Sequence, residues 1–164
     1  MSHTFYNSLD SSCKSPFGAI PAGQAVTFNL TVPENLGYVD PHLVLTKDRE
    51  SPVHYRMEFT GQTPNINHFT LTVTPTTSGL YFYHFDLYTD FRRIYRTPGG
   101  EGVLSWTEGQ EWQLTVYEPG FKTPDWLKNG TMYQIFPDRF CEGKPNKEMP
   151  FADRIYRADK TGEP

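Results

Sequence analysis

The 164-residue sequence has little cysteine, no long apolar run and no concentration of positive charge. Its two cysteines, Cys13 and Cys141, stand at opposite ends of the chain. Two cysteines are too few for a disulfide framework or a cysteine-based zinc site, so we expect two free thiols. The formal net charge is −4 and lysines and arginines form no run, which argues against a nucleic-acid partner. No stretch of about 20 apolar residues is present, so we expect no membrane partner.

The first ten residues, MSHTFYNSLD, have neither a positively charged start nor an apolar stretch after it. A secretory signal peptide needs both. We therefore expect a cytoplasmic location.

Aromatic residues are plentiful, and they offset a low apolar content. Hydrophobic residues make up 37% of the chain, whereas Phe, Trp and Tyr alone make up 15%. Each aromatic side chain buries a large area. A β-rich domain of about 100–120 residues could form a stable core from this composition.

Between residues 24 and 117 the apolar residues recur with period two, which is typical of half-buried strands. In QAVTFNLTV, the residues Val26, Phe28, Leu30 and Val32 share one parity. Further runs of this kind lie at 41–48, 53–59, 68–74, 79–89, 91–96 and 111–117. Turn-forming residues separate the runs. Seven short strands at this spacing predict an all-β, immunoglobulin-like antiparallel β-sandwich.

Three of these runs carry specific expectations. The run at 53–59 predicts one strand with Val53, Tyr55, Met57 and Phe59 on its inner face. The run at 79–89 is aromatic on both parities, which predicts a central strand with both faces occupied. In the run at 111–117, Trp112 is in phase with its apolar neighbours and is expected in the core.

Composition also divides the chain into segments. Residues 1–23 are rich in Ser, Gly and Pro and are either a leader or an ordered edge, and residues 24–118 form the sandwich. Residues 119–129 carry Pro and Gly and are interpreted as a linker. Residues 130–164 begin with an apolar run, expected to be a strand over 132–137, and become mostly polar.

The segment PDWLKNGTMYQIFPDRF, residues 124–140, resembles the entry to the catalytic barrel of glycoside hydrolase family 13, the α-amylase family. The resemblance is greatest to its neopullulanase, cyclomaltodextrinase and maltogenic amylase branch. Pro124, Asp125, Trp126 and the run 133–140 carry it. It implies a β-sandwich followed by the first strand of a (β/α)8 barrel. Because such a barrel needs about 250 residues, residues 130–164 would be the start of an incomplete catalytic domain.

The resemblance further implies an N-terminal domain of an enzyme that degrades starch, maltodextrin, cyclodextrin or pullulan. Its partners would be an α-glucan and its own catalytic barrel, with a homodimer as a further option. The family's catalytic carboxylates, which retaining hydrolysis places about 5 Å apart, lie on later barrel strands. We therefore expect no catalytic residue in this chain. Asp138, at the end of the barrel strand, is interpreted as structural.

Calcium is the usual metal of the family, and it requires several oxygen ligands. In the segment CEGKPNKEMP only Glu142 and Asn146 offer side-chain oxygens before Lys147, and Lys144 lies between them. We therefore expect no metal and no cofactor in this chain, and calcium only in the parent enzyme.

A sugar-binding surface needs exposed aromatic rings that stack on the apolar face of a pyranose. Trp106, in a polar turn, is the first candidate for carbohydrate binding, and Tyr95 and Tyr88 follow. Trp126 is expected at the interface between sandwich and barrel.

Three hypotheses remain open from the sequence. The chain is a docking domain of a family 13 enzyme, an autonomous starch- or glycogen-binding module, or an unrelated immunoglobulin-like interaction domain that carries YQIFPDRF by chance. Affinity electrophoresis of the isolated chain in starch or glycogen gels distinguishes the docking domain from the binding module.

Overall fold

The computed structural model describes residues 4–88, 91–128 and 130–136. The chain divides into two compact units, Met1–Phe121 and Lys122–Pro164. The described residues contain strands and two short 3-10 turns, and they include no helix long and apolar enough to cross a membrane.

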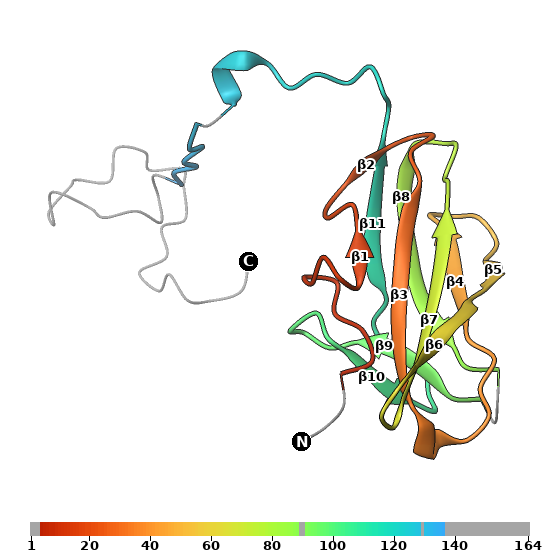
Figure 1. Cartoon of the computed structure of the whole chain (residues 1–164). Coiled ribbons are helices and arrows are strands. Elements are labelled where there is room, and N and C mark those ends of the chain that lie inside the picture. Colours follow the sequence, from red (N-terminus) through yellow and green to blue (C-terminus); the bar gives the residue numbers. More distant parts are fainter. Residues whose placement is uncertain (1–3, 89–90, 129, 137–164) are drawn as a thin grey trace, which may run out of the picture. The chain divides into compact units, whose positions relative to one another are not determined.

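The first unit is a β-sandwich of two sheets (Figure 1). The four-stranded sheet has the order β1 (Lys14–Ser15), β3 (Val26–Pro33), β7 (Ile66–Val73), β6 (Glu58–Thr63). The seven-stranded sheet contains β10 (Gly102–Ser105), β9 (Arg93–Arg96), β8 (Gly79–Asp86), β11 (Trp112–Tyr117), β2 (Ile20–Pro21), β4 (His42–Lys47) and β5 (Val53–Arg56). Every pairing is antiparallel except that of β11 with β2. The predicted sandwich is confirmed.

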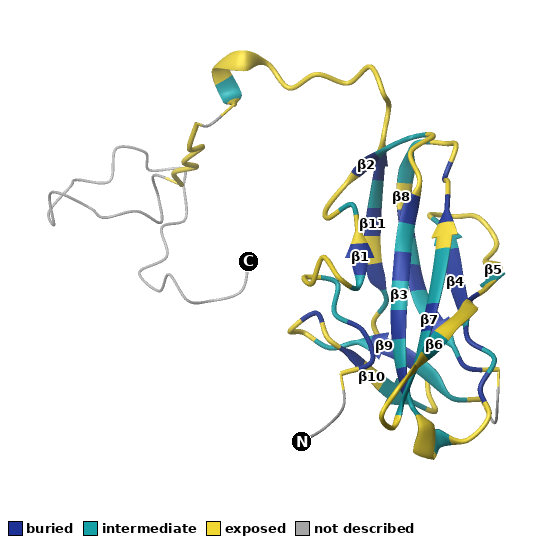
Figure 2. Ribbon diagram, in the orientation of Figure 1, coloured by how far each residue is buried: buried dark blue, intermediate teal, exposed yellow. Residues whose placement is uncertain are grey.

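The core lies between the two sheets, where alternate residues of β3, β8 and β11 are buried (Figure 2). Along β3 the residues of the predicted parity are all buried, and their neighbours are half-buried. Trp112 is 1% exposed, as expected from its phase in β11. The aromatic strand β8 is central, because it pairs with β4 on one side and with β9 and β11 on the other.

The N-terminal segment is part of the sandwich. Phe5, Tyr6 and Ile20 are buried in the core. The backbone of β1 pairs with β3, and that of β2 pairs with β11. Lys14 is also buried, and its ammonium group donates to the carbonyl oxygens of Pro16 and Gly18 at 3.0 and 2.8 Å. Among its described residues, 4–23, this segment is therefore an ordered edge.

The single strand predicted at 53–59 is wrong. The chain forms β5 in one sheet, crosses at Met57, and forms β6 in the other. Met57 is 4% exposed, but Val53 and Phe59 are 49% and 59% exposed. Val53 lies directly opposite the core residue Leu45, and Phe59 lies directly opposite the core residue Phe69, so both are on the inner side of their sheets as the parity predicts. They are exposed because β5 and β6 are edge strands, each paired on one side only.

In the second unit the 3-10 turn η2 (Asp125–Leu127) is followed by an irregular segment. The strand predicted at 132–137 is not formed by the described residues 130–136, which pair with no strand. An extended segment becomes part of a sheet only where a neighbouring backbone accepts its hydrogen bonds, and no other described segment pairs with this one. Asp138, Cys141, Glu142 and Asn146 lie outside the described residues.

Candidate functional site

The outer face of the seven-stranded sheet carries a cluster of charged and aromatic side chains. On β8, His84 and Asp86 alternate with the core residues Tyr83 and Phe85, so they point to this outer face. Together with residues of β4, β5, β9 and the segment before β11, they surround an open hollow of about 400 Å³, the sheet-face hollow. Its lining residues are Val44, Thr46, Pro52, His54, His84, Asp86, Arg93, Tyr95, Glu108, Gly109 and Glu111.

His84 is held on both sides in this hollow. Its Nδ1 lies 2.6 Å from Oε1 of Glu111, and its ring stacks on Tyr95 with centroids 4.8 Å apart. Burial lowers the pKa of His84 below its ordinary value, and this effect outweighs the opposing effect of the Glu111 carboxylate. His84 is therefore a neutral imidazole at pH 7, and its Nδ1–H donates to Glu111.

A second charged pair lies beside it. Nε of Arg93 is 3.4 Å from Oδ2 of Asp86, and this buried atom makes no hydrogen bond. The hollow therefore combines a carboxylate-bound imidazole with a guanidinium that is incompletely satisfied. The described part of the chain holds no group of three or more His, Cys, Asp or Glu side chains placed to bind a metal ion.

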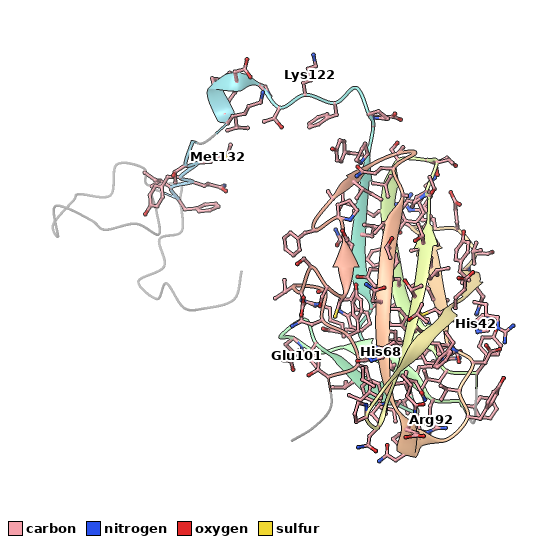
Figure 3. All side chains as sticks on the ribbon, viewed as in Figure 1. His42, His68, Arg92, Glu101, Lys122 and Met132 are labelled. Atoms are coloured by element: carbon pink, nitrogen blue, oxygen red, sulfur yellow. The ribbon has the colours of Figure 1, made fainter. Side chains whose placement is uncertain are left out.

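The structure brings two of the three predicted carbohydrate-binding residues to this face. Tyr95 lines the hollow, but it is only 5% exposed, so its ring offers no open face for a sugar. Tyr88 follows β8 and is 55% exposed. Its ring lies 4.2 Å from that of His42, which Figure 3 labels, and its hydroxyl is 3.2 Å from Nδ1 of His54.

Trp106 lies apart from this group. It directly follows β10, is 67% exposed, and is absent from the lining of the hollow. Its exposure fits a stacking platform.

A larger hollow was missed by sequence reasoning. It has a volume of about 830 Å³ and lies where the chain switches sheets between β5 and β6. We call it the strand-switch hollow; it is lined by Gly37, Tyr38, Val39, Asp40, Arg56, Met57, Glu58, Phe59, Asn67 and Phe69. The available signal was the turn sequence NLGYVD, which places Tyr38 directly after a glycine and outside the period-two runs.

No family model matches this chain, but several proteins are similar to it in sequence or structure. An amylopullulanase of Thermoanaerobacter thermohydrosulfuricus is 30% identical over 156 residues, which is 87% of this chain and 10% of that protein. The chain is homologous to a segment of the amylopullulanases. This homology confirms the predicted resemblance to an N-terminal region of a family 13 enzyme.

Neopullulanase 2 of Thermoactinomyces vulgaris is 50% identical over 30 residues, 18% of this chain and 5% of that protein. A solved cyclomaltodextrinase structure is similar over 77% of this chain and 22% of its own, with 17% identity and a TM-score of 0.46. The chain thus spans about a tenth of the length of the amylopullulanases it matches.

Proposed function

We propose that this chain is a non-catalytic β-sandwich domain of an α-glucan-degrading glycoside hydrolase, and that it docks on the catalytic barrel of the same polypeptide. The homology to amylopullulanases is the observation that carries this proposal. The matched share of the chain, 87%, exceeds the extent of the first unit, Met1–Phe121, so the alignment includes residues of both units. The same amylopullulanases are therefore homologous to the sandwich and to at least part of the segment that follows it.

The second unit carries the apolar surface that such docking would cover. Five of its described side chains are large, apolar and mostly exposed: Trp126, Met132, Tyr133, Ile135 and Phe136. Single exposed apolar residues are ordinary, but a run of them is typical of an interaction surface. The proposed occupant is the rest of the catalytic barrel, because nine tenths of each matched amylopullulanase lies outside the alignment.

The test compares the complete polypeptide that contains this chain with a variant that lacks residues 1–121. If the sandwich docks on the barrel, the variant has a lower melting temperature and a lower kcat/KM on soluble starch, and gel filtration with light scattering reports any change in oligomeric state. Equal melting temperature, activity and number of subunits in the two proteins would refute docking. The 164-residue chain by itself is expected to be inactive on pullulan, cyclodextrin and soluble starch.

A second candidate function is α-glucan binding by the sandwich alone, favoured by the 67% exposure of Trp106. Affinity electrophoresis in starch or glycogen gels tests it. Retardation that is lost in Trp106→Ala would support binding at this residue, and no retardation would support docking alone. The hypothesis of an unrelated interaction domain is set aside by the amylopullulanase homology. The cytoplasmic location stays a prediction.

A further inference from the structure

We propose that the strand-switch hollow is a binding site for glucose units of an α-glucan chain, with Tyr38 and Phe59 as its stacking rings. The ligand class rests on the proposed function, and the place in the fold rests on the hollow itself. None of the residues that the sequence singled out for carbohydrate binding lines this hollow.

The floor of the hollow is preformed, because its residues belong to the packed core. Val39, Met57 and Phe69 are buried in the core at 8%, 4% and 7% exposure. Backbone hydrogen bonds fix the loop that carries Tyr38: the amide of Asp40 donates to Leu87 at 3.1 Å, and the amide of Met57 donates to Pro41 at 2.8 Å. A preformed floor of this kind lowers the entropy cost of binding.

Two aromatic rings rise from this floor into solvent. Tyr38 is 77% exposed, and Phe59 is 59% exposed. Phe59 is held in place from below, since its ring packs edge to face on Phe69 with centroids 5.7 Å apart. Both rings therefore offer accessible faces on a fixed base, which is what the apolar face of a pyranose requires.

Polar groups that can bind hydroxyls line the same hollow as these rings. Nε of Arg56 donates to Oδ1 of Asp40 at 2.7 Å, which orients both side chains. This bond uses one of the five N–H donors of Arg56, and the others make no hydrogen bond to a described residue. Glu58 and Asn67 line the same hollow, and neither side chain bonds to a described residue.

The charges in the hollow favour a neutral polyhydroxyl ligand. Two carboxylates, Asp40 and Glu58, stand beside the single guanidinium of Arg56, so an anion would be repelled. Sugar hydroxyls can donate to the carboxylates and accept from the guanidinium and the Asn67 amide. The volume, about 830 Å³, is within the range of roughly 300–1,000 Å³ that is usual for small-molecule sites.

The experiment is isothermal titration calorimetry of the 164-residue chain with maltoheptaose, with cellohexaose as a β-linked control. We expect maltoheptaose to bind and Tyr38→Ala and Phe59→Ala each to weaken binding by about three- to tenfold, as for the loss of one stacked ring. Arg56→Gln is expected to weaken it by a similar factor. Trp106→Ala is the matched control: it also removes an exposed aromatic ring, but outside the hollow.

The outcomes separate this site from the alternatives. Affinity unchanged in Tyr38→Ala and Phe59→Ala, affinity lost only in Trp106→Ala, or no binding of maltoheptaose would each overturn the proposal. Because Tyr38 and Phe59 are mostly exposed, circular dichroism should show the variants folded, so that lost affinity reports the site. Failure here leaves the docking role intact, because docking is tested separately by deletion of residues 1–121 from the complete polypeptide.

Discussion

The hydroxyl groups of Tyr6 and Tyr83 lie 2.8 Å apart in the centre of the sandwich core, although 77 residues separate them in sequence. Both residues are 0% exposed. Tyr6 also packs its ring 4.9 Å from that of Trp112, whose indole N–H donates to the carbonyl of Gly100 at 2.9 Å. The N-terminal segment is thereby joined to the central strand β8 by a buried hydrogen bond as well as by apolar contact.

Loss of either hydroxyl should destabilise the fold. Tyr6→Phe or Tyr83→Phe leaves one buried hydroxyl without a partner, which costs about 1–3 kcal/mol. The double variant removes both groups and should be no less stable than either single variant. Urea unfolding of the four proteins in a double-mutant cycle measures this coupling, and strictly additive losses would contradict it.

The same pair predicts instability at alkaline pH. Burial raises the pKa of both Tyr6 and Tyr83 above the ordinary value. The unfolded state then releases its tyrosine protons from about pH 10, while the folded state retains them, so the free energy of unfolding must fall as the pH rises above that value. Urea midpoints measured from pH 8 to pH 11 should decrease more in the wild type than in the Tyr6→Phe, Tyr83→Phe double variant. Parallel decreases would count against this account.

His84 predicts a second pH dependence, on the acidic side. Its pKa is lowered in the folded state, chiefly by burial. At a pH above the ordinary pKa of histidine, His84 is neutral in both the folded and the unfolded protein. As the pH falls below that pKa, the unfolded protein binds a proton at this residue more readily than the folded protein does, so the free energy of unfolding decreases. Between pH 7 and pH 5 the unfolding free energy should therefore decrease less in His84→Gln than in the wild type. Equal decreases in the two proteins would contradict this assignment.

Met57 fills the core at the point where the chain changes sheets. Met57→Ala is expected to lower the unfolding free energy by about 2–5 kcal/mol, because it leaves a cavity between the sheets. Val53, in the same run of sequence, is 49% exposed, and Val53→Thr keeps its β-branched shape. That control should change stability by no more than about 0.5 kcal/mol. Equal losses in the two variants would contradict the position of Met57 in the core.

Gly102 has no room for a side chain. A Cβ atom there would lie 2.8 Å from Cγ2 of Ile94 and 3.3 Å from both the Trp112 ring and the Tyr6 carbonyl oxygen. Gly102→Ala should therefore cost about 1–3 kcal/mol through displacement of the packed core. Gly120→Ala adds a methyl group into open space and is the control. Thermal unfolding of the two variants should differ by several degrees, and matching melting temperatures would show that the core accommodates the methyl group.

Period-two patterning located the strands because each has one face on the core, a property that repeats along a few consecutive residues. It did not reveal the break at Met57, because the inner parity continues from β5 into β6 while the chain changes sheets. Short strands such as β1 and β2 carry too few residues to show any period, so the sequence left residues 1–23 undecided.

The sequence predicted which type of residue would form a candidate site, but not which of these residues would be exposed. Trp106 and Tyr88 are exposed, as a stacking residue must be, whereas Tyr95 is buried against His84. Whether an aromatic residue on a strand is open to solvent depends on the neighbouring strand, which can be distant in sequence.

The residues themselves determined an aromatic-rich β-sandwich and a resemblance to the α-amylase family, because alternation and a contiguous motif are local properties of a chain. Tertiary structure alone decided that Tyr6 joins the core, that Phe59 faces solvent, and that Tyr38 and Arg56 share one hollow. Those relations depend on contacts between segments that are far apart in sequence, and no short-range pattern encodes such distances.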